Sequence, residues 1–301
     1  MLSKRVMAGL PLGLAVAIAG CGGSSSNQAS QTTHQTSAVA SSQSGTSSSQ
    51  STMPSSQSGM SGSGSSAAMM EAHTGARVSV ASPAPGTVVT GPSVPFHVAL
   101  SNFKVDCSSA GTPDKAGVGH YHITLDGSLI NMYCEPNSQV SMLDVKPGMH
   151  MLGFIPASNE HADDMKAAKM VPIDYRPATA ATTVTPLHFP GKPQIEILSP
   201  KSGETVHGTL TLHIAVKNFK LSCAMYGKPD VAGYGHWHLN VDSTTMGMMG
   251  MGTMLRMSCS NTLSISLAHI KPGTHRFYAI LEDNQHAPTP KAMASVSVNV
   301  G

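Results

Sequence analysis

The clearest pattern along the chain is an alternation of apolar and polar residues in two short segments. In residues 236–241 the apolar side chains are Trp237, Leu239 and Val241, and histidines occupy alternate positions; residues 120–125 repeat the pattern. Successive side chains of a β-strand point to opposite faces. The apolar set therefore forms the core face, and the histidines are predicted to project from the other face, towards solvent or a covering loop.

Further segments of the second half are also predicted to form strands. β-Branched residues are enriched in runs that are separated by turn signals rich in Pro, Gly and Ser. The predicted strands are Thr209–Val216, His236–Val241, Thr262–Leu267, His275–Leu281 and Ala294–Val300. Helical periodicity is confined to a turn or two around residues 162–170. Several short strands at this spacing in about 100 residues predict an all-β, immunoglobulin-like sandwich.

The folded part of the chain contains an internal duplication. Residues 102–107 match residues 218–223 at an offset of 116. The motif Gly-x-Gly-His-x-His recurs at the same offset, whereas the later Lys-Pro-Gly and Asn-x-His-Ala motifs recur at an offset of 125. The second copy therefore contains a nine-residue insertion, which we place within Met246–Met257.

The duplication predicts two tandem immunoglobulin-like β-sandwich domains. Their expected bounds are residues 69–176 and 193–301. Residues 177–192, rich in Ala, Thr and Pro, are the expected linker, and the proline content makes it semi-rigid.

The N-terminus has the features of an export signal. Lys4 and Arg5 precede an apolar stretch over residues 6–19, and the segment Ile18–Cys21 resembles the lipobox of bacterial lipoproteins. This resemblance implies that residues 1–20 are removed and that Cys21 is acylated and held in membrane lipid. The alternative is an ordinary cleaved signal in which Cys21 is incidental. The lipoprotein interpretation places the mature protein on the extracytoplasmic side of the cell membrane, in the periplasm or at the cell surface.

Residues 21–68 follow as a predicted tether. Of the 47 residues from 22 to 68, 19 are serine and none is charged. Such a segment cannot bury enough apolar surface to offset the entropy of ordering. We expect a disordered spacer that holds the folded domains away from the membrane.

Charge and composition exclude several classes of partner and fold. Without Lys4 and Arg5 the chain has 16 basic and 16 acidic residues and no basic run, which argues against nucleic acid as a partner. Charged residues make up only 11% of the chain, too few for a coiled coil.

The cysteines fit an exported protein. Apart from Cys21, each copy contains two, at equivalent positions. An oxidising compartment favours one disulfide in each domain, Cys107–Cys134 and Cys223–Cys259. Thiolate metal ligation is the alternative, but the close pairs of cysteines typical of such sites are missing.

The repeated His-x-His strands are the main candidate for chemistry. Two histidines at positions i and i+2 of one strand lie close enough to bind one metal ion, and neutral imidazole suits copper, zinc and nickel. A later loop histidine in each copy provides a third nitrogen. The candidate ligands are His120, His122 and His161 in the first copy and His236, His238 and His286 in the second. His150 and His275 also recur, but each opens a strand after a Pro-Gly turn and need have no function.

The insertion adds a second hint of metal chemistry. It contains methionines interleaved with glycine, and thioethers select Cu(I). The candidate ligands there are Met246, Met248, Met249 and Met251. The alternative is an adaptable apolar loop, and the histidines have an alternative structural role of holding loop carbonyls.

No sequence motif of a hydrolase, kinase or metalloprotease is present, so a non-enzymatic protein is expected. Asp163 and Asp164 are adjacent and are interpreted as part of a solvated loop.

Together the motifs resemble small secreted immunoglobulin-like bacterial domains of an uncharacterised family. These domains have a Gly-His-x-His strand and a late His-x-Pro loop. The resemblance covers residues 76–175 and 193–300 and implies a fold and a location. One departure is that Asp163 stands where the second copy has Pro288. If this proline shapes the loop, the first site is degraded.

A more distant likeness is to copper–zinc superoxide dismutases, which also carry a His-x-His copper half-site on a sandwich strand. The histidine cluster of their zinc loop is not evident, so dismutase activity is not inferred. The leading hypothesis is a membrane-anchored, extracytoplasmic binding protein for copper, with zinc a weaker candidate. The competing hypothesis is an envelope adhesion or structural module without metal, which would bind an envelope protein or a glycan.

Overall fold

The computed structural model describes residues 73–244 and 253–301. The predicted signal peptide, Cys21 and the serine-rich tether lie outside the described residues, as do four methionines of the insertion, Met246, Met248, Met249 and Met251. Within the described residues, no helix is long and apolar enough to cross a membrane.

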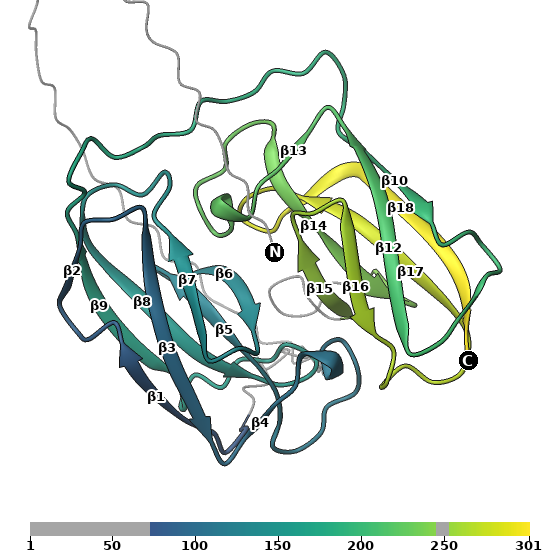
Figure 1. The fold of residues 1–301 in the computed structure, drawn as a ribbon, viewed down its shortest axis with the longest axis horizontal. Helices are drawn as coiled ribbons and strands as arrows, with labels where there is room; N and C mark the ends of the chain where they lie inside the picture. The colour runs from purple at the N-terminus through teal and green to yellow at the C-terminus, as the bar shows by residue number, and fades with distance from the viewer. Residues whose placement is uncertain (1–72, 245–252) are drawn as a thin grey trace, which may run out of the picture. The chain divides into compact units, whose positions relative to one another are not determined.

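Each copy contains nine strands in the described residues, and the strands correspond one to one (Figure 1). In the first copy they are β1 (Arg77–Ser82), β2 (Thr87–Val89), β3 (Ser93–Ser101), β4 (Lys104–Val105), β5 (Val118–Leu125), β6 (Ser128–Tyr133), β7 (Asn137–Ser141), β8 (Gly148–Ala157) and β9 (Lys169–Tyr175). In the second copy they are β10 (Gln194–Ser199), β11 (Thr205–Val206), β12 (Thr209–Lys217), β13 (Lys220–Leu221), β14 (Tyr234–Val241), β15 (Met254–Ser258), β16 (Thr262–Ser266), β17 (Gly273–Glu282) and β18 (Pro288–Val300).

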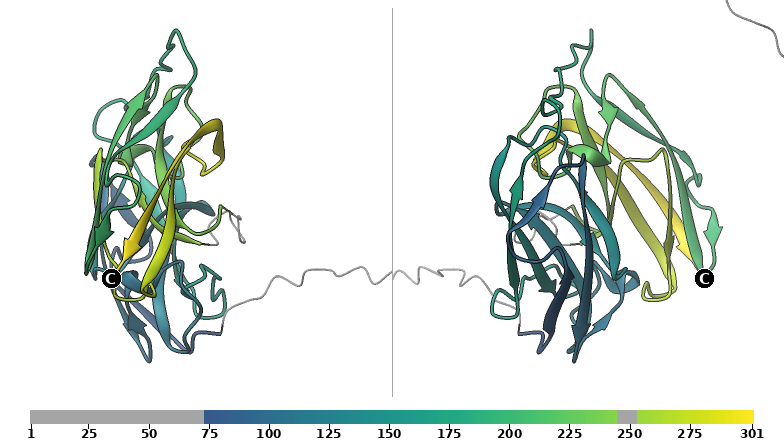
Figure 2. Two further views of the ribbon diagram at one scale, coloured as in Figure 1. Left: turned by 90° about the vertical axis from the view of Figure 1, so that its right-hand side faces the viewer. Right: turned by 60° about the vertical axis from the view of Figure 1, so that its left-hand side comes forward.

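The strands form two sheets in each copy, so the predicted β-sandwich class is confirmed. The smaller sheet has the order β1-β3-β7, and the larger has β2-β9-β8-β5-β4 with β6 also paired to β5. The second copy repeats both orders as β10-β12-β16 and β11-β18-β17-β14-β13, with β15 paired to β14. Figure 2 shows the strands of each copy from two further directions.

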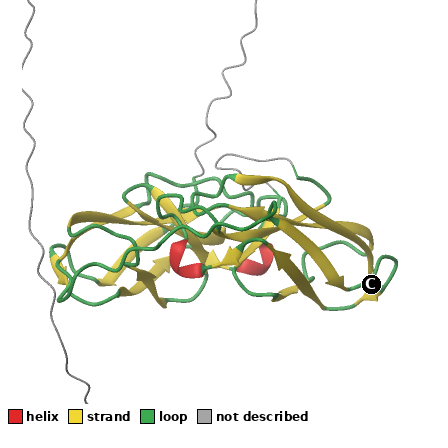
Figure 3. Cartoon of the chain, turned by 90° about the horizontal axis from the view of Figure 1, so that it is seen from above, coloured by secondary structure: helices red, strands yellow, loops and turns green. Residues whose placement is uncertain are grey.

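Two 3-10 turns are the only helical elements in the described residues. They are η1 (Cys107–Ser109) and η2 (Cys223–Met225), drawn in red in Figure 3. The turn or two of helix expected around residues 162–170 does not form: residues 165–167 make a single turn, and β9 begins at Lys169.

Each core is built on the aromatic residue at the centre of the His-x-His strand. Tyr121 and Trp237 are 1% and 0% exposed. Each directs its polar group to the carbonyl that follows a disulfide cysteine: the Tyr121 hydroxyl donates to Glu135 O at 2.5 Å, and Trp237 Nε1 donates to Ser260 O at 2.9 Å. Burial of a ring together with a satisfied polar group is typical of Tyr and Trp in cores.

The insertion lies in the hairpin that joins β14 to β15. In the first copy Asp126 and Gly127, both with positive φ, close the corresponding hairpin between β5 and β6. Met254 and Met257, which the sequence placed in or next to a flexible loop, belong instead to β15 and are buried. The backbone of β15 pairs with β14, and the two methionine side chains pack against the core of the first copy.

The two copies share a packed interface within one compact unit. Tyr226, Met254 and Met257 of the second copy belong to the same apolar cluster as the core of the first. The segment between the copies is held at both ends: Asp144 N donates to Thr182 O at 3.0 Å, and Leu187 N donates to Ala232 O at 2.9 Å.

Candidate metal centre

The structure brings together both predicted sets of three histidines. In each set one ring nitrogen of every histidine lies within 4.8 Å of the other two. The sets, named here site 1 and site 2, consist of His120, His122 and His161, and of His236, His238 and His286. In the described part of the chain, these two sets are the groups in which three potential metal-binding side chains come together.

Strand geometry positions the first two histidines of each site. His120 and His122 follow Gly119 on β5, and their Nε2 atoms lie 3.0 Å apart. A side chain at Gly119 would collide with the Ala157 carbonyl and the Phe103 ring, and Gly235 has the same relation to Glu282 and Phe219. The glycine before each His-x-His pair therefore lets β5 and β14 lie close to β8 and β17.

In site 2 three nitrogens converge on one point. His236 Nε2 lies 2.9 Å from His238 Nε2 and 2.9 Å from His286 Nδ1, and the third side of the triangle is 3.3 Å. Three nitrogens bound to one ion at about 2.0–2.1 Å, with angles of about 90–110°, lie about 2.9–3.4 Å apart. The triangle therefore has the dimensions of a three-nitrogen metal site.

The third histidine of each site has its tautomer fixed by the other copy. His161 Nε2 lies 2.7 Å from Met254 O, and His286 Nε2 lies 2.9 Å from Leu129 O. A carbonyl only accepts hydrogen bonds, so each Nε2 carries the proton and each neutral ring directs the lone pair of Nδ1 into its site. Both histidines have φ of 65°, an uncommon conformation for residues other than glycine; such strain is found at functional sites.

The carbonyl groups of Met254 and Leu129 each also lie against a glycine of the other copy. Gly111 has φ of 72°, and a Cβ there would lie 2.6 Å from Met254 O. Gly227 has φ of 64°, and a Cβ there would lie still closer to Leu129 O. Because Met254 and Leu129 are equivalent residues of β15 and β6, the contacts are reciprocal. Each site is closed by a strand of the other copy, whereas the sequence predicted solvent or a loop over the histidines.

Each site also has a carboxylate beside the second histidine of its strand. His122 Nδ1 donates to Asp163 Oδ1 at 2.7 Å, and Glu282 Oε1 lies 3.8 Å from His238 Nδ1. The Asp163 carboxylate on the outer nitrogen of His122 directs the inner nitrogen to a metal and makes it more basic, whereas the Glu282 carboxyl group makes no hydrogen bond to His238. Sequence reasoning missed both carboxylates because neither recurs in the other copy.

The prediction that Asp163 and Asp164 belong to a solvated loop is wrong. Asp163 binds His122, and the buried Asp164 accepts hydrogen bonds from the backbone and hydroxyl of Thr74, both at 2.7 Å. Both side chains fix the loop that carries His161: Asp163 holds it against β5, and Asp164 holds it against the start of the described chain.

The loop of site 1 is not degraded by its lack of the proline. The hydrogen bond from Ser158 N to Ala162 O matches the one from Asp283 N to Ala287 O, and both are 2.9 Å. The shared φ of His161 and His286 shows the same backbone conformation in both copies. Asp163, which replaces the proline, supplies the carboxylate of site 1.

Burial keeps four of the six site histidines neutral. It lowers the pKa of His161 to about 3 and holds the pKa of His120, His236 and His238 well below the ordinary value. Positive charge on a neighbouring imidazole lowers these pKa values further. Neutral imidazoles have the lone pairs that metal binding requires.

Buried polar atoms without a partner concentrate around the two sites. Buried groups in proteins are nearly always hydrogen-bonded. Within the described residues the exceptions near the sites are side-chain atoms of His120, Thr124, Asn159, His161, His236, Glu282 and Asn284. Asn159 and Asn284 precede the loop histidines by two residues in both copies. This clustering is expected where a bound group completes the site.

A buried methionine faces the second strand histidine of each site. Met132 is the cross-strand partner of His122, and Met257 is the cross-strand partner of His238. Residues directly opposite in an antiparallel pair point to the same face of the sheet. The two methionines recur at the offset of 125, which is the signal that could have identified Met132.

His150 and His275, which also recur in both copies, have a structural role. His150 Nδ1 lies 2.7 Å from Asp126 Oδ2, and its Nε2 lies 2.8 Å from Lys146 O. His275 makes the same two contacts with Asp242 and Lys271. Both ring nitrogens are therefore used at the start of β8 and β17, away from sites 1 and 2.

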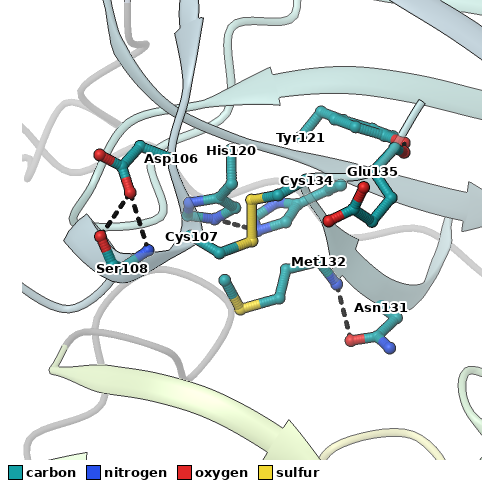
Figure 4. Close-up of a disulfide and its surroundings, with 10 residues drawn as sticks. Asp106, Cys107, Ser108, His120, Tyr121, Asn131, Met132, Cys134 and Glu135 are labelled. Carbon is teal, nitrogen blue, oxygen red and sulfur yellow. Dashed lines mark hydrogen bonds between the residues drawn. A yellow bond between two sulfur atoms is a disulfide. The ribbon is translucent and has the colours of Figure 1, made fainter. Parts of the chain in front are cut away.

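The structure contains both disulfides, Cys107–Cys134 and Cys223–Cys259. Figure 4 shows that the first joins η1 to the end of β6 next to His120 and Met132. The Asp106 carboxylate accepts from Ser108 N at 3.0 Å and caps η1. The disulfide therefore fixes the segment that leads to Gly111, which lies against the other copy.

Comparisons with known proteins give fold likeness only. No family model matches the chain, and no curated protein matches it in sequence. Among solved structures it is similar to fibronectin(III)-like modules of CbhA from Clostridium thermocellum, with 13% identity over 74% of this chain and 93% of that chain and a TM-score of 0.25.

Two further structures are similar at the same level. The N-terminal four Ig domains of Dscam1 isoform 4.44 share 9% identity over 74% of this chain and 45% of that chain, with a TM-score of 0.20. A tetra-tandem repeat in the extending region of a large adhesion protein shares 11% identity over 75% of this chain and 48% of that chain, also at 0.20. The chain thus spans less than half the length of these two structures, and the likeness says nothing of function.

Proposed function

We propose that the protein binds transition-metal ions, one at each histidine site, and that copper is its metal. The observation that carries this proposal is the triangle of nitrogens in site 2, whose sides of 2.9–3.3 Å match three ligands on one ion. Site 1 repeats the convergence of three histidines, with one ring nitrogen of each within 4.8 Å of the other two, and Asp163 holds its His122. This duplication supports a selected metal site over a chance cluster.

Donor chemistry favours copper over zinc. Imidazole nitrogen suits both metals, but a thioether is a soft ligand that selects Cu(I). Met132 and Met257 lie on the same sheet face as His122 and His238, in register with them. The mixture of imidazole and thioether groups is suited to holding copper in either oxidation state.

The proposed location is the extracytoplasmic side of a membrane. It rests on the lipobox resemblance at Ile18–Cys21 and on the two disulfides, which persist in oxidising compartments. In this proposal acylated Cys21 anchors the chain in lipid, and the role is to bind or hold the metal rather than to catalyse a reaction.

The test is a metal titration of the full-length protein with its disulfides intact. Calorimetry with Cu(II), with Cu(I) kept reduced by ascorbate, and with Zn(II) should show two equivalents of copper. The double variant His120→Ala/His122→Ala and the double variant His236→Ala/His238→Ala should each lose one equivalent, and the quadruple variant should lose both.

The matched control is the double variant His150→Ala/His275→Ala. It removes two histidines that also recur in both copies but contact Asp126 and Asp242, so it should retain two equivalents. If wild-type protein binds no metal more tightly than about 100 μM, about 5.5 kcal/mol, while the quadruple variant melts at lower temperature, the histidines only fix loops. The envelope-module hypothesis would then replace this proposal.

A further inference from the structure

One buried, unpartnered group lies away from the histidine sites. Lys228 follows η2 and is 2% exposed, and within the described residues its Nζ has no hydrogen-bond partner. Burial of an ammonium without a partner is costly. Burial lowers the pKa of Lys228 to about 8, although Asp126 and Asp144 of the first copy act in the opposite direction.

Lys228 lines a pocket of about 510 Å³ between the two copies. Pockets of about 300–1,000 Å³ are the usual size for small-molecule sites. Its apolar walls include Ile130 and Tyr226, and its polar lining includes Asn131, Ser138 and Gln139. The pocket therefore offers one cation, several neutral hydrogen-bonding groups and an aromatic wall.

The internal duplication provides a natural comparison for this pocket. The equivalent position between the copies is lined by Cys107, Leu255, Arg256 and Ser264, and its volume is only about 70 Å³. Arg256 replaces Asn131, and both are cross-strand partners of equivalent residues. Thr112 stands at the position of Lys228. Only one of the two equivalent places thus combines open space with a cation.

The chemistry of the lining selects the class of ligand. A single ammonium balances a single negative charge, and a carboxylate is the organic group that carries one. A phosphate dianion is usually bound by arginine or by several donors of positive charge, which the pocket lacks. Hydroxyl and amide side chains next to an aromatic wall suit an organic body with polar substituents.

We propose that this pocket is a binding site for a small organic carboxylate, whose carboxylate group pairs with Lys228 Nζ. An acidic sugar and a short acidic peptide both present such a group. The proposal is independent of metal binding, because none of the six site histidines lines the pocket.

The experiment is a calorimetric titration of the metal-free full-length protein with four probes. Glucuronate and N-acetylglutamate carry the carboxylate, whereas glucose and N-acetylglutamine are their neutral counterparts. We expect one equivalent of one or both acidic probes to bind at least about tenfold more tightly than its neutral match, a difference of about 1.4 kcal/mol. The probe that binds identifies the source of the carboxylate.

Three variants locate the site. Lys228→Met should weaken the acidic probe at least about tenfold, and its melting temperature should not fall because the buried charge is unpaired. Asn131→Arg copies the filled equivalent pocket and should block the probe although Lys228 remains. Lys217→Met, which removes an exposed lysine, should change nothing.

The reverse change tests whether space alone is enough. Arg256→Asn should open the smaller pocket without adding a second equivalent, because Thr112 provides no cation there. The proposal is overturned if Lys228→Met binds the acidic probes as wild type does, if neutral probes bind equally well, or if no probe binds below about 10 mM, about 2.7 kcal/mol.

Discussion

The two histidine sites share their ligands and differ in the residue that supports them. In site 1 the carboxylate beside the second histidine is Asp163, from the loop after β8; in site 2 it is Glu282, from the end of β17. The equivalent positions hold Pro288 and Ala157. The two carboxyl groups thus come from different backbone positions to the same side of the second histidine, but only Asp163 hydrogen-bonds to it.

The sites also differ in the solvent exposure of their side chains. The Asp163 side chain is 14% exposed, whereas Glu282 is fully buried and its burial raises the pKa of the carboxyl to about 9. In site 2 the Tyr226 ring packs 4.5 Å from the His236 ring, where the first copy has Ala110. Site 2 thus has the more buried carboxyl group, whereas its loop histidine, His286, is 9% exposed and His161 of site 1 is 1% exposed.

The reciprocal closure of the sites gives the largest predicted effect. Gly111→Ala and Gly227→Ala each place a methyl group against a carbonyl of the other copy, at positive φ. We expect each to lower the free energy of unfolding by about 2–4 kcal/mol, as measured by urea denaturation. Because the contacts are reciprocal, the two variants should cost similar amounts.

Gly127→Ala is the control for that comparison. Gly127 has φ of 85° but open space where its Cβ would lie, so only the backbone term remains, about 1 kcal/mol. Equal effects of Gly127→Ala and Gly227→Ala would show that the copies do not close each other's sites.

The second prediction separates the two carboxylates. Asp163→Ala should weaken copper binding at site 1 about 10–100-fold, whereas Glu282→Ala should have a smaller effect at site 2, because Glu282 makes no hydrogen bond to His238. Each variant should leave the other site unchanged in a calorimetric titration. Weakening of both sites by either variant would indicate general destabilisation instead of a supporting role.

Much of this arrangement could be predicted from the sequence. Alternation in residues 236–241 identified the face that carries the histidines, and the repeat brought His161 and His286 to them. These predictions succeed because strand period and duplication are local properties of the sequence. The cysteine pairs followed from the same repeat together with the exported character of the chain.

The supports could not be predicted, because comparison of the copies detects only what recurs. Asp163 and Glu282 occupy non-equivalent positions, so the comparison made Asp163 look like a defect. The closure of each site by Leu129 or Met254 depends on tertiary contact between the copies, which no strand period encodes. The insertion hid β15, because Met254 and Met257 of this strand look like a continuation of the methionine-rich segment before it.

The third prediction concerns Lys228, where the first copy has Thr112. The folded-state pKa of about 8 lies below the ordinary value of 10.5. Between these values the unfolded chain binds more protons than the folded chain, so stability rises with pH. The slope should reach up to about 1.4 kcal/mol per pH unit, in urea denaturation series from pH 7.5 to 10.5. Lys228→Met should flatten it; an unchanged slope would assign the effect to other groups.

The smallest change is expected when the support of one site is exchanged for that of the other. Ala157→Glu with Asp163→Pro gives site 1 the carboxylate and the loop proline of site 2. If the supports are interchangeable, copper affinity at site 1 should stay within about threefold of wild type, about 0.7 kcal/mol, whereas Asp163→Pro alone should lose about 10–100-fold. The titration is made with the His236→Ala/His238→Ala variant, so that only copper binding at site 1 is measured. Recovery by Ala157→Glu would show that both positions serve one ring nitrogen; failure to recover would mean that His122 needs the shorter 2.7 Å contact that Asp163 makes.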